Sequence, residues 1–271
     1  MQNEQEVKDI VREKYGDIAR KTSSGNCCGS SNKIAGYTIM KDEYTGLGGY
    51  TSDADLGLGC GLPTEFANIQ PGNVVVDLGS GAGNDVFVAR ALAGDSGKVI
   101  GIDMTEEMIA KARRNNDKLG YNNVEFYLGE IEAMPLENQS ADVVISNCVL
   151  NLVPNKQKAF AEIFRILKTG GHFCVSDIVI NGELSASLKN SAAMYAGCVA
   201  GAVQQDEYLE IINAAGFKNV VIKKIKVIDL PDEVLLQYLS KEEIISFREM
   251  EIGIFSITVV AEKQEKGRSG N

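Results

Sequence analysis

The stretch from Val74 to Gly83 reads VVVDLGSGAG and is followed by NDVFVARALA at residues 84–93. An apolar run of strand length gives way to an acid and to three glycines at alternate positions. Apolar residues then recur at helical spacing. A strand, a glycine turn and a helix in this order form the nucleotide-binding unit of open α/β sheets, because glycine lets the backbone pass close beneath a ligand. The stretch therefore predicts a ligand site at the carboxyl end of a strand.

The spacing of the glycines separates two kinds of nucleotide fold. A dinucleotide-binding turn has the form G-x-G-x-x-G, but here Asn84 stands at the third glycine position and Gly83 comes one residue earlier. This spacing counts against a nicotinamide dehydrogenase. The D-x-G-x-G-x-G form of residues 77–83 resembles the turn of class I S-adenosylmethionine methyltransferases. That resemblance implies S-adenosylmethionine as the cofactor.

Composition narrows the class of protein further. The chain has 271 residues, which suffice for one large domain or for one domain with an appendage. A formal net charge of -10 argues against a nucleic-acid partner, since phosphate binding needs a positive surface. With a polar N-terminus and no apolar run of membrane-spanning length, we expect no membrane partner and a cytoplasmic location. Six cysteines in such a chain are expected to be reduced and available for soft-ligand or redox chemistry.

Strands and helices are expected to alternate through the middle of the chain. This alternation predicts an α/β fold: a Rossmann-like, doubly wound, mostly parallel seven-stranded sheet. We expect an N-terminal helix with cysteine-bearing loops over the active site in 1–64, a cofactor-binding domain in 65–179, and a substrate region with a helical insertion in 180–271. Strands are expected at 74–78, 98–103, 124–128, 141–147, 172–177, 220–227 and 253–262, and helices at 4–20, 84–93, 105–119, 156–167, 205–215 and 241–250, with an insertion at 182–203 and a disordered tail at 263–271.

The sequence offers a candidate binding residue for each part of S-adenosylmethionine. Backbone N–H groups of the turn would meet its carboxylate, and Asp103, 26 residues after Asp77, would accept from the ribose hydroxyls. Met104 and Ile131 could flank the adenine, with Glu130 accepting from its amine. Alternatively, Asp103 and Glu130 start the next helices and Met104 is ordinary core. The expected cofactor set is Asp77, Gly79, Ser80, Gly81, Gly83, Asp103, Met104, Glu130, Ile131 and Asn147, the last beside the methionine moiety.

Cysteines, rather than a base, occupy the positions expected for the methyl acceptor. The sole histidine, His172, is interpreted as a turn or edge residue, and Cys148 directly follows the fourth strand. Cys60 lies in a glycine loop and Cys198 in the Ala/Gly-rich insertion, at separations of 88 and 50 residues that fit no zinc finger. They would converge if the N-terminal arm and the insertion fold over the sheet. Three thiolates suit a thiophilic ion, and bound trivalent arsenic keeps a lone pair that needs no general base to attack a methyl group.

Four segments together carry a more specific resemblance. GLGCG (57–61), DLGSGAG (77–83), NCVLNL (147–152) and AGCVAGA (196–202) look like the arsenite S-adenosylmethionine methyltransferases, over roughly residues 21–260. The resemblance implies that Cys60, Cys148 and Cys198 bind As(III), and that Cys28 or Cys27 pairs with Cys60 in disulfide exchange. It also implies arsenite or its thiol conjugate as the small-molecule substrate, mono- and dimethylated products, and a thiol reductant such as glutathione or thioredoxin. Asn84 departs from the family, where many relatives carry arginine.

Two rival hypotheses remain at this point. A class I methyltransferase for another small acceptor would use the cysteines only for packing. A non-catalytic arsenic-binding protein would keep the thiols, but it has no need of the glycine turn beside Asp103. The sixth cysteine, Cys174, lies inside the strand expected at 172–177 and is predicted to belong to the core.

Overall fold

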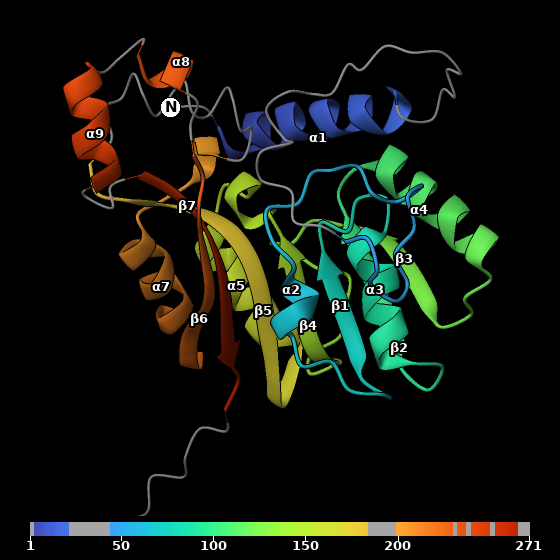
Figure 1. Cartoon of the computed structure of the whole chain (residues 1–271). Helices are drawn as coiled ribbons and strands as arrows, with labels where there is room; N and C mark the ends of the chain where they lie inside the picture. The colour runs from blue at the N-terminus through green and yellow to red at the C-terminus, as the bar shows by residue number, and fades with distance from the viewer. Residues whose placement is uncertain are drawn as a thin grey trace, which may run out of the picture.

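A seven-stranded sheet forms the centre of the protein (Figure 1), in the order β3-β2-β1-β4-β5-β7-β6. The structure is a computed structural model that describes residues 3–21, 44–183, 199–229, 232–236, 240–249 and 253–264. The first five strands in this order are parallel, and β7 is antiparallel to both of its neighbours. This arrangement confirms the predicted mostly parallel, Rossmann-like sheet. The strands are β1 (Val74–Leu78), β2 (Lys98–Asp103), β3 (Val124–Leu128), β4 (Ala141–Asn147), β5 (Leu167–Asn181), β6 (Lys218–Val227) and β7 (Gly253–Glu262).

Helices cover both faces of the sheet, as a doubly wound fold requires. Helices α3 (Asn84–Ala93) and α4 (Glu106–Leu119) lie on one face, and α5 (Lys156–Ile166) and α7 (Gln205–Ala214) on the other (Figure 1). Helix α1 (Glu4–Lys21) packs against α4 across the carboxyl ends of the strands. The shorter elements are α2 (Pro63–Phe66), η1 (Leu150–Leu152), η2 (Val199–Gly201), α8 (Asp232–Leu235) and α9 (Lys241–Glu249).

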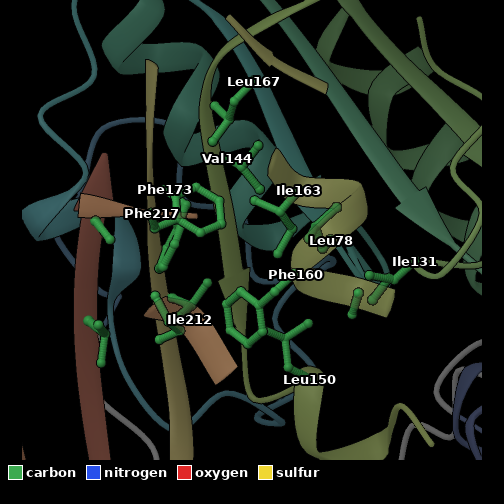
Figure 2. Packing of buried hydrophobic residues seen from close by; sticks show 14 of the residues in the cluster. Leu78, Ile131, Val144, Leu150, Phe160, Ile163, Leu167, Phe173, Ile212 and Phe217 are labelled. Carbon is green, nitrogen blue, oxygen red and sulfur yellow. The ribbon is translucent and has the colours of Figure 1, made fainter. Parts of the chain in front are cut away.

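Aromatic packing makes one face of the sheet rigid (Figure 2). The rings of Phe173 and Phe217 meet edge to face, with centroids 4.7 Å apart, and Phe160 packs against Phe173 at 5.7 Å. All three side chains are fully buried. Burying each one stabilises the fold by roughly 1.5–3 kcal/mol. On the opposite face Phe87 and Phe126 belong to a second buried cluster under α3 and α4. The sheet is therefore a firm platform for side chains at its edge.

Strand register brings the ends of three strands to one place. Leu78 at the end of β1 pairs with Ile102 in β2 and with Ser146 in β4. Because parallel strands in this register stop together, Asp103 and Asn147 lie at the same edge as the glycine turn that follows β1. Residues far apart in the chain therefore lie close together at the carboxyl ends of β1, β2 and β4.

Several predicted boundaries differ from the structure. Strand β5 runs to Asn181 rather than to Asp177, because β7 pairs with it continuously from His172 to Asn181. The short helices α2 and α8 were not predicted. Of the expected helical insertion, residues 184–198 lie outside the described residues, as do residues 265–271 of the tail. None of the helices in the described ranges is long and apolar enough to cross a membrane.

Candidate active site

A pocket of about 1170 Å³, including space open to solvent, lies at the carboxyl ends of β1, β2 and β4. Nine of the ten predicted cofactor residues line it, and Cys148 is among its walls. Gly83 and Cys60 are not among the lining residues. The lining residues among the predicted set are Asp77, Gly79, Ser80, Gly81, Asp103, Met104, Glu130, Ile131, Asn147 and Cys148.

The three glycines of the turn, which we call the glycine turn (Gly79–Gly83), serve different purposes. Gly79 has φ 65°, and a Cβ there would lie 2.5 Å from the Val149 side chain. Gly81 has φ 52°, and nothing lies within 4 Å of where its Cβ would be, so its backbone faces the open pocket. At Gly83 a Cβ would strike the Phe87 ring at 2.9 Å. Gly83 therefore permits close helix packing rather than ligand approach.

Asp103 fixes the shape of the glycine turn. Its Oδ2 accepts from the Gly81 backbone N–H at 2.9 Å, and its Oδ1 accepts from the Thr105 N–H at 2.8 Å. Burial raises the pKa of this carboxyl, and these backbone bonds oppose the rise. The Thr105 side chain and the Met104 backbone N–H also hydrogen-bond this carboxylate. The role of Asp103 toward the paired hydroxyls of a ribose stays a prediction.

Asp77 is a buried acid at the end of β1. It is 2% exposed, and its pKa is raised well above the usual range by burial and by the nearby carboxylates Asp85 and Asp103. A carboxylate in this position favours a positively charged ligand, because a cation would offset both the burial and the repulsion. S-adenosylmethionine carries an ammonium and a sulfonium, and it fits this requirement.

Two buried polar atoms in the pocket wall have no hydrogen-bond partner within the described part of the chain. They are the Ser80 hydroxyl oxygen and the Asn84 side-chain carbonyl. Leaving such groups unsatisfied costs roughly 1–3 kcal/mol each, so they mark a place for a polar ligand. Together with the acids and the open backbone at Gly81, these atoms fit the polar end of S-adenosylmethionine.

Helix α1 closes the pocket on the side of the expected adenine site. Lys8 lies between Glu130 and Glu132, with Nζ to oxygen distances of 2.7 and 2.6 Å, and Arg12 reaches Glu130 at 3.4 Å. Val11 from the same helix lines the cavity. The Glu130 carboxylate expected to accept from adenine thus already has two cationic partners. Its role toward the base stays a prediction.

On the other side of the pocket, one amide connects two cysteines. Cys148 follows β4 with φ 61°, which is unusual for a residue with a side chain, and its N–H donates to the Ser176 carbonyl at 2.7 Å. The Asn147 side-chain oxygen accepts from the Cys60 N–H at 3.0 Å. The neighbouring residue of Cys148 therefore holds Cys60 directly. Both cysteines are buried, at 1–2% exposure.

The glycines on either side of Cys60 allow this approach. A Cβ on Gly59 would lie 2.6 Å from the Asn147 amide nitrogen, and one on Gly61 would lie 2.5 Å from the Ser176 hydroxyl. The Cys60 carbonyl accepts from the Ser256 hydroxyl at 2.6 Å. The segment Leu56–Leu62, which we call the Cys60 loop, is thus held against β4, β5 and β7 through its backbone.

The remaining predicted cysteines have different outcomes. Cys27, Cys28 and Cys198 lie outside the described residues. Cys174 is fully buried in β5, and burial raises the pKa of its thiol, in agreement with the predicted core role. The ring of His172 hydrogen-bonds the Ala67 carbonyl at 2.6 Å, so the histidine holds the segment after α2 in place.

Sequence reasoning missed several polar residues around the cysteines. Tyr44 and Asp85 hydrogen-bond one another beside Asn147. The Tyr208 hydroxyl donates to Asp177 at 3.2 Å. The pKa of Tyr208 is raised, mainly by burial and then by Asp177 and the thiols of Cys60 and Cys148. Burial raises the pKa of Asp177 to about 7. The one available signal was an acid in the first turn of a mostly apolar helix, as Asp85 is in NDVFVARALA.

The strand order, the glycine turn and the acids at the strand ends define a Rossmann-like, S-adenosylmethionine-dependent methyltransferase. A family model described as "Methyltransferase domain" matches residues 69–216. The arsenite methyltransferase of Halobacterium salinarum is 40% identical over 230 residues, 80% of this chain. That of Aquipseudomonas alcaligenes is 33% identical over 241 residues, 85% of this chain. The chain belongs to the family of arsenite S-adenosylmethionine methyltransferases.

A solved structure agrees with this assignment. The arsenic(III) S-adenosylmethionine methyltransferase of Chlamydomonas reinhardtii is 33% identical, with a TM-score of 0.63, and the match covers 77% of this chain and 68% of that one. The chain spans 59% of the length of the Halobacterium protein and 68% of the Aquipseudomonas protein. S-adenosylmethionine is the methyl donor of this family.

Proposed function

We propose that this protein methylates trivalent arsenic. Arsenite, delivered as a thiol conjugate, would be held by the thiolates of Cys60, Cys148 and Cys198 and would receive the methyl group of S-adenosylmethionine. The observation that carries the proposal is the Asn147 side chain: it binds the Cys60 backbone, while its own residue precedes Cys148 and lines the pocket. The Cys60 backbone is thereby fixed beside the residue that precedes Cys148, which supports a shared thiol site at the edge of the cofactor pocket.

The chemistry suits this arrangement. S-adenosylmethionine supplies an electrophilic methyl group, and transfer is an in-line displacement in which positioning is the main contribution of the protein. The lone pair of arsenic forms the new As–C bond, so no side chain has to remove a proton. This agrees with the structural role of His172. A soft thiolate environment selects a thiophilic ion over hard cations.

Transfer of a methyl cation raises arsenic formally from the trivalent to the pentavalent state. Two thiolates can return it to the trivalent state by giving up two electrons and forming a disulfide. We propose Cys60 and Cys28, with Cys27 as the alternative, for this step. An external dithiol or glutathione then reduces the disulfide by thiol–disulfide exchange. Repetition would give mono- and then dimethylated arsenicals, and the need for reduced thiols favours a cytoplasmic location.

The test is incubation of the full chain with arsenite, glutathione and methyl-labelled cofactor, followed by chromatographic separation of the arsenic species. The proposal predicts label in mono- and dimethylated arsenicals. Cofactor binding with no labelled arsenical above a protein-free control would leave a methyltransferase for another acceptor. Arsenite binding without cofactor binding would leave a non-catalytic arsenic-binding protein. Either outcome refutes arsenic methylation.

A further inference from the structure

A buried hydrogen-bond network lies between the cofactor pocket and the Cys60 loop. The Tyr44 hydroxyl donates to the Asp85 carboxylate, with distances of 2.9 and 3.0 Å to its two oxygens. The Asn147 amide donates to the Tyr44 hydroxyl at 2.6 Å and approaches Asp85 Oδ2 at 3.1 Å. Tyr44 is 4% exposed and Asp85 is 8% exposed. None of these contacts belongs to the regular secondary structure.

The network holds the Cys60 loop through its backbone. The Gly61 carbonyl accepts from the Asn147 amide at 2.8 Å and lies 3.3 Å from the Tyr44 hydroxyl oxygen. One residue earlier, the Cys60 N–H donates to the oxygen of the same amide. The backbone on both sides of the Cys60 side chain is therefore fixed, and so is the starting point of its sulfur.

Asp85 connects this loop to the methyl-donor side. It is the second residue of α3, directly after Asn84 and the glycine turn, and it lines the cofactor pocket. A single carboxylate thus touches the segment that shapes the cofactor site and, through Tyr44 and Asn147, the segment that carries a thiol. A buried carboxylate is costly unless charge-assisted hydrogen bonds satisfy it. Here the donors that satisfy it are the ones that hold the loop.

We propose that Asp85 and Tyr44 are positioning residues, which fasten the Cys60 loop to the glycine turn and thereby set the distance between the arsenic-binding thiol and the methyl donor. The catalytic part of this inference rests on the proposed function. Reacting atoms must approach to about 3–3.5 Å, and a misplacement of about 1 Å can cost roughly 100-fold in rate. A loop held only by main-chain contacts at its ends would not keep such a tolerance.

Two substitutions each remove one member's hydrogen bonds from the network without removing a thiol. Tyr44→Phe deletes the hydroxyl and keeps the ring, and Asp85→Asn deletes the charge and keeps the shape. The matched control is Tyr50→Phe, because Tyr50 stacks on Tyr44 with ring centroids 6.5 Å apart but its hydroxyl bonds Asp55. The first readout is the rate at which iodoacetamide alkylates Cys60, measured by peptide mass spectrometry. The fully buried Cys174 serves as the internal reference for global opening.

In Tyr44→Phe and in Asp85→Asn, Cys60 is expected to react about tenfold faster while Cys174 stays protected, because loss of a charge-assisted hydrogen bond shifts a local equilibrium by about that factor. Tyr50→Phe is expected to react like the wild type. Unchanged Cys60 reactivity in both network variants would overturn the proposal. Faster reaction of Cys60 and Cys174 together in both variants would also overturn it, because the network would then support the whole fold.

The second readout is methyl transfer with saturating cofactor. Tyr44→Phe is expected to lower kcat about tenfold while cofactor affinity changes less than about twofold, a split that simple loss of folded protein would not give. Faster Cys60 alkylation with unchanged kcat would contradict the positioning role. If the wild type itself methylates no arsenic, the proposed function fails, whereas the alkylation rates still decide whether the network holds the loop.

Discussion

The two sides of the pocket are built in different ways. On the cofactor side, a continuous strand–turn–helix supplies Gly79 and Gly81, and the next strand supplies Asp103 to brace them. On the thiol side, Cys60 and Cys148 come from distant parts of the chain, and the Asn147 side chain hydrogen-bonds the Cys60 backbone. The first side depends on local backbone geometry, and the second on long-range hydrogen bonds. Changes to the two sides should therefore separate cofactor binding from methyl transfer.

The largest expected effect comes from removing a thiol. Cys148→Ala should lower arsenic methylation by about 100-fold or more, since a missing ligand displaces the acceptor from the line of attack. Cofactor binding, measured by calorimetry, should stay within about twofold of the wild type. The matched control is Cys174→Ala, which removes a thiol from the core and should keep most of the activity. Equal losses in both variants would mean that the cysteines serve only for packing.

Removing the brace on the cofactor side should give the reverse pattern. Asp103→Asn is expected to weaken cofactor binding about tenfold, because a charged acceptor for the ribose is lost. The methyl-transfer rate at saturating cofactor should change much less. Asp142→Asn is the control, as Asp142 also accepts from a backbone N–H, that of Val74 at 2.8 Å, at the opposite end of the sheet. If Asp103→Asn binds cofactor normally, Asp103 has no role in the site.

Alanine substitution of one glycine on each side of the pocket compares the cofactor side with the thiol side directly. Gly79→Ala adds a Cβ 2.5 Å from Val149 at a positive φ, so we expect loss of cofactor binding and a destabilisation of about 1–3 kcal/mol. Gly61→Ala should displace the Cys60 loop and lower kcat with cofactor affinity retained. Gly120→Ala has a similar φ with open space around its Cβ, and it isolates the backbone strain. Thermal unfolding and calorimetry on the three variants would measure stability and cofactor affinity. Identical behaviour of Gly79→Ala and Gly61→Ala would contradict the difference between the two sides.

The smallest effect is a dependence of cofactor affinity on pH. Burial raises the pKa of Asp85 to about 6, and burial with neighbouring carboxylates raises that of Asp77. These groups are protonated at low pH and ionise as the pH rises through their raised pKa values. A cationic cofactor prefers the ionised forms, so its affinity should increase severalfold from about pH 5 to about pH 7 as Asp85 ionises. An affinity that falls over this interval would contradict the assignment of these acids to the cofactor site.

The sequence predicted the strands and strand ends around the pocket well, because local signals carry them. Apolar runs ending in glycines or acids placed β1, β2 and the strand ends at Asp103 and Asn147 correctly. Nine cofactor candidates line one pocket for the same reason. Gly83 makes room for the Phe87 ring and is not among the pocket's lining residues, so its role toward the cofactor stays a prediction.

The thiol side was harder to predict, because no local pattern encodes it. Convergence of the cysteines was expected only if the N-terminal arm and the insertion fold over the sheet, and the family resemblance then implied it; spacing alone gave no reason to join Cys60 to Cys148. The hydrogen bond between Tyr44 and Asp85 spans 41 positions, and the contact of Asn147 with Tyr44 spans 103. Such side-chain contacts depend on how the Cys60 loop crosses the sheet edge. Only the three-dimensional arrangement reveals them.

A single-turnover experiment tests the central claim most directly. The reduced protein is loaded with one equivalent of arsenite, freed of excess thiol, and mixed with methyl-labelled S-adenosylmethionine. The account predicts about one labelled methyl group on arsenic per protein, together with a disulfide that includes Cys60. The account is contradicted if the label stays on the cofactor while arsenite remains bound. It is also contradicted if methyl transfer leaves Cys60 reduced and is unaffected by Cys148→Ala.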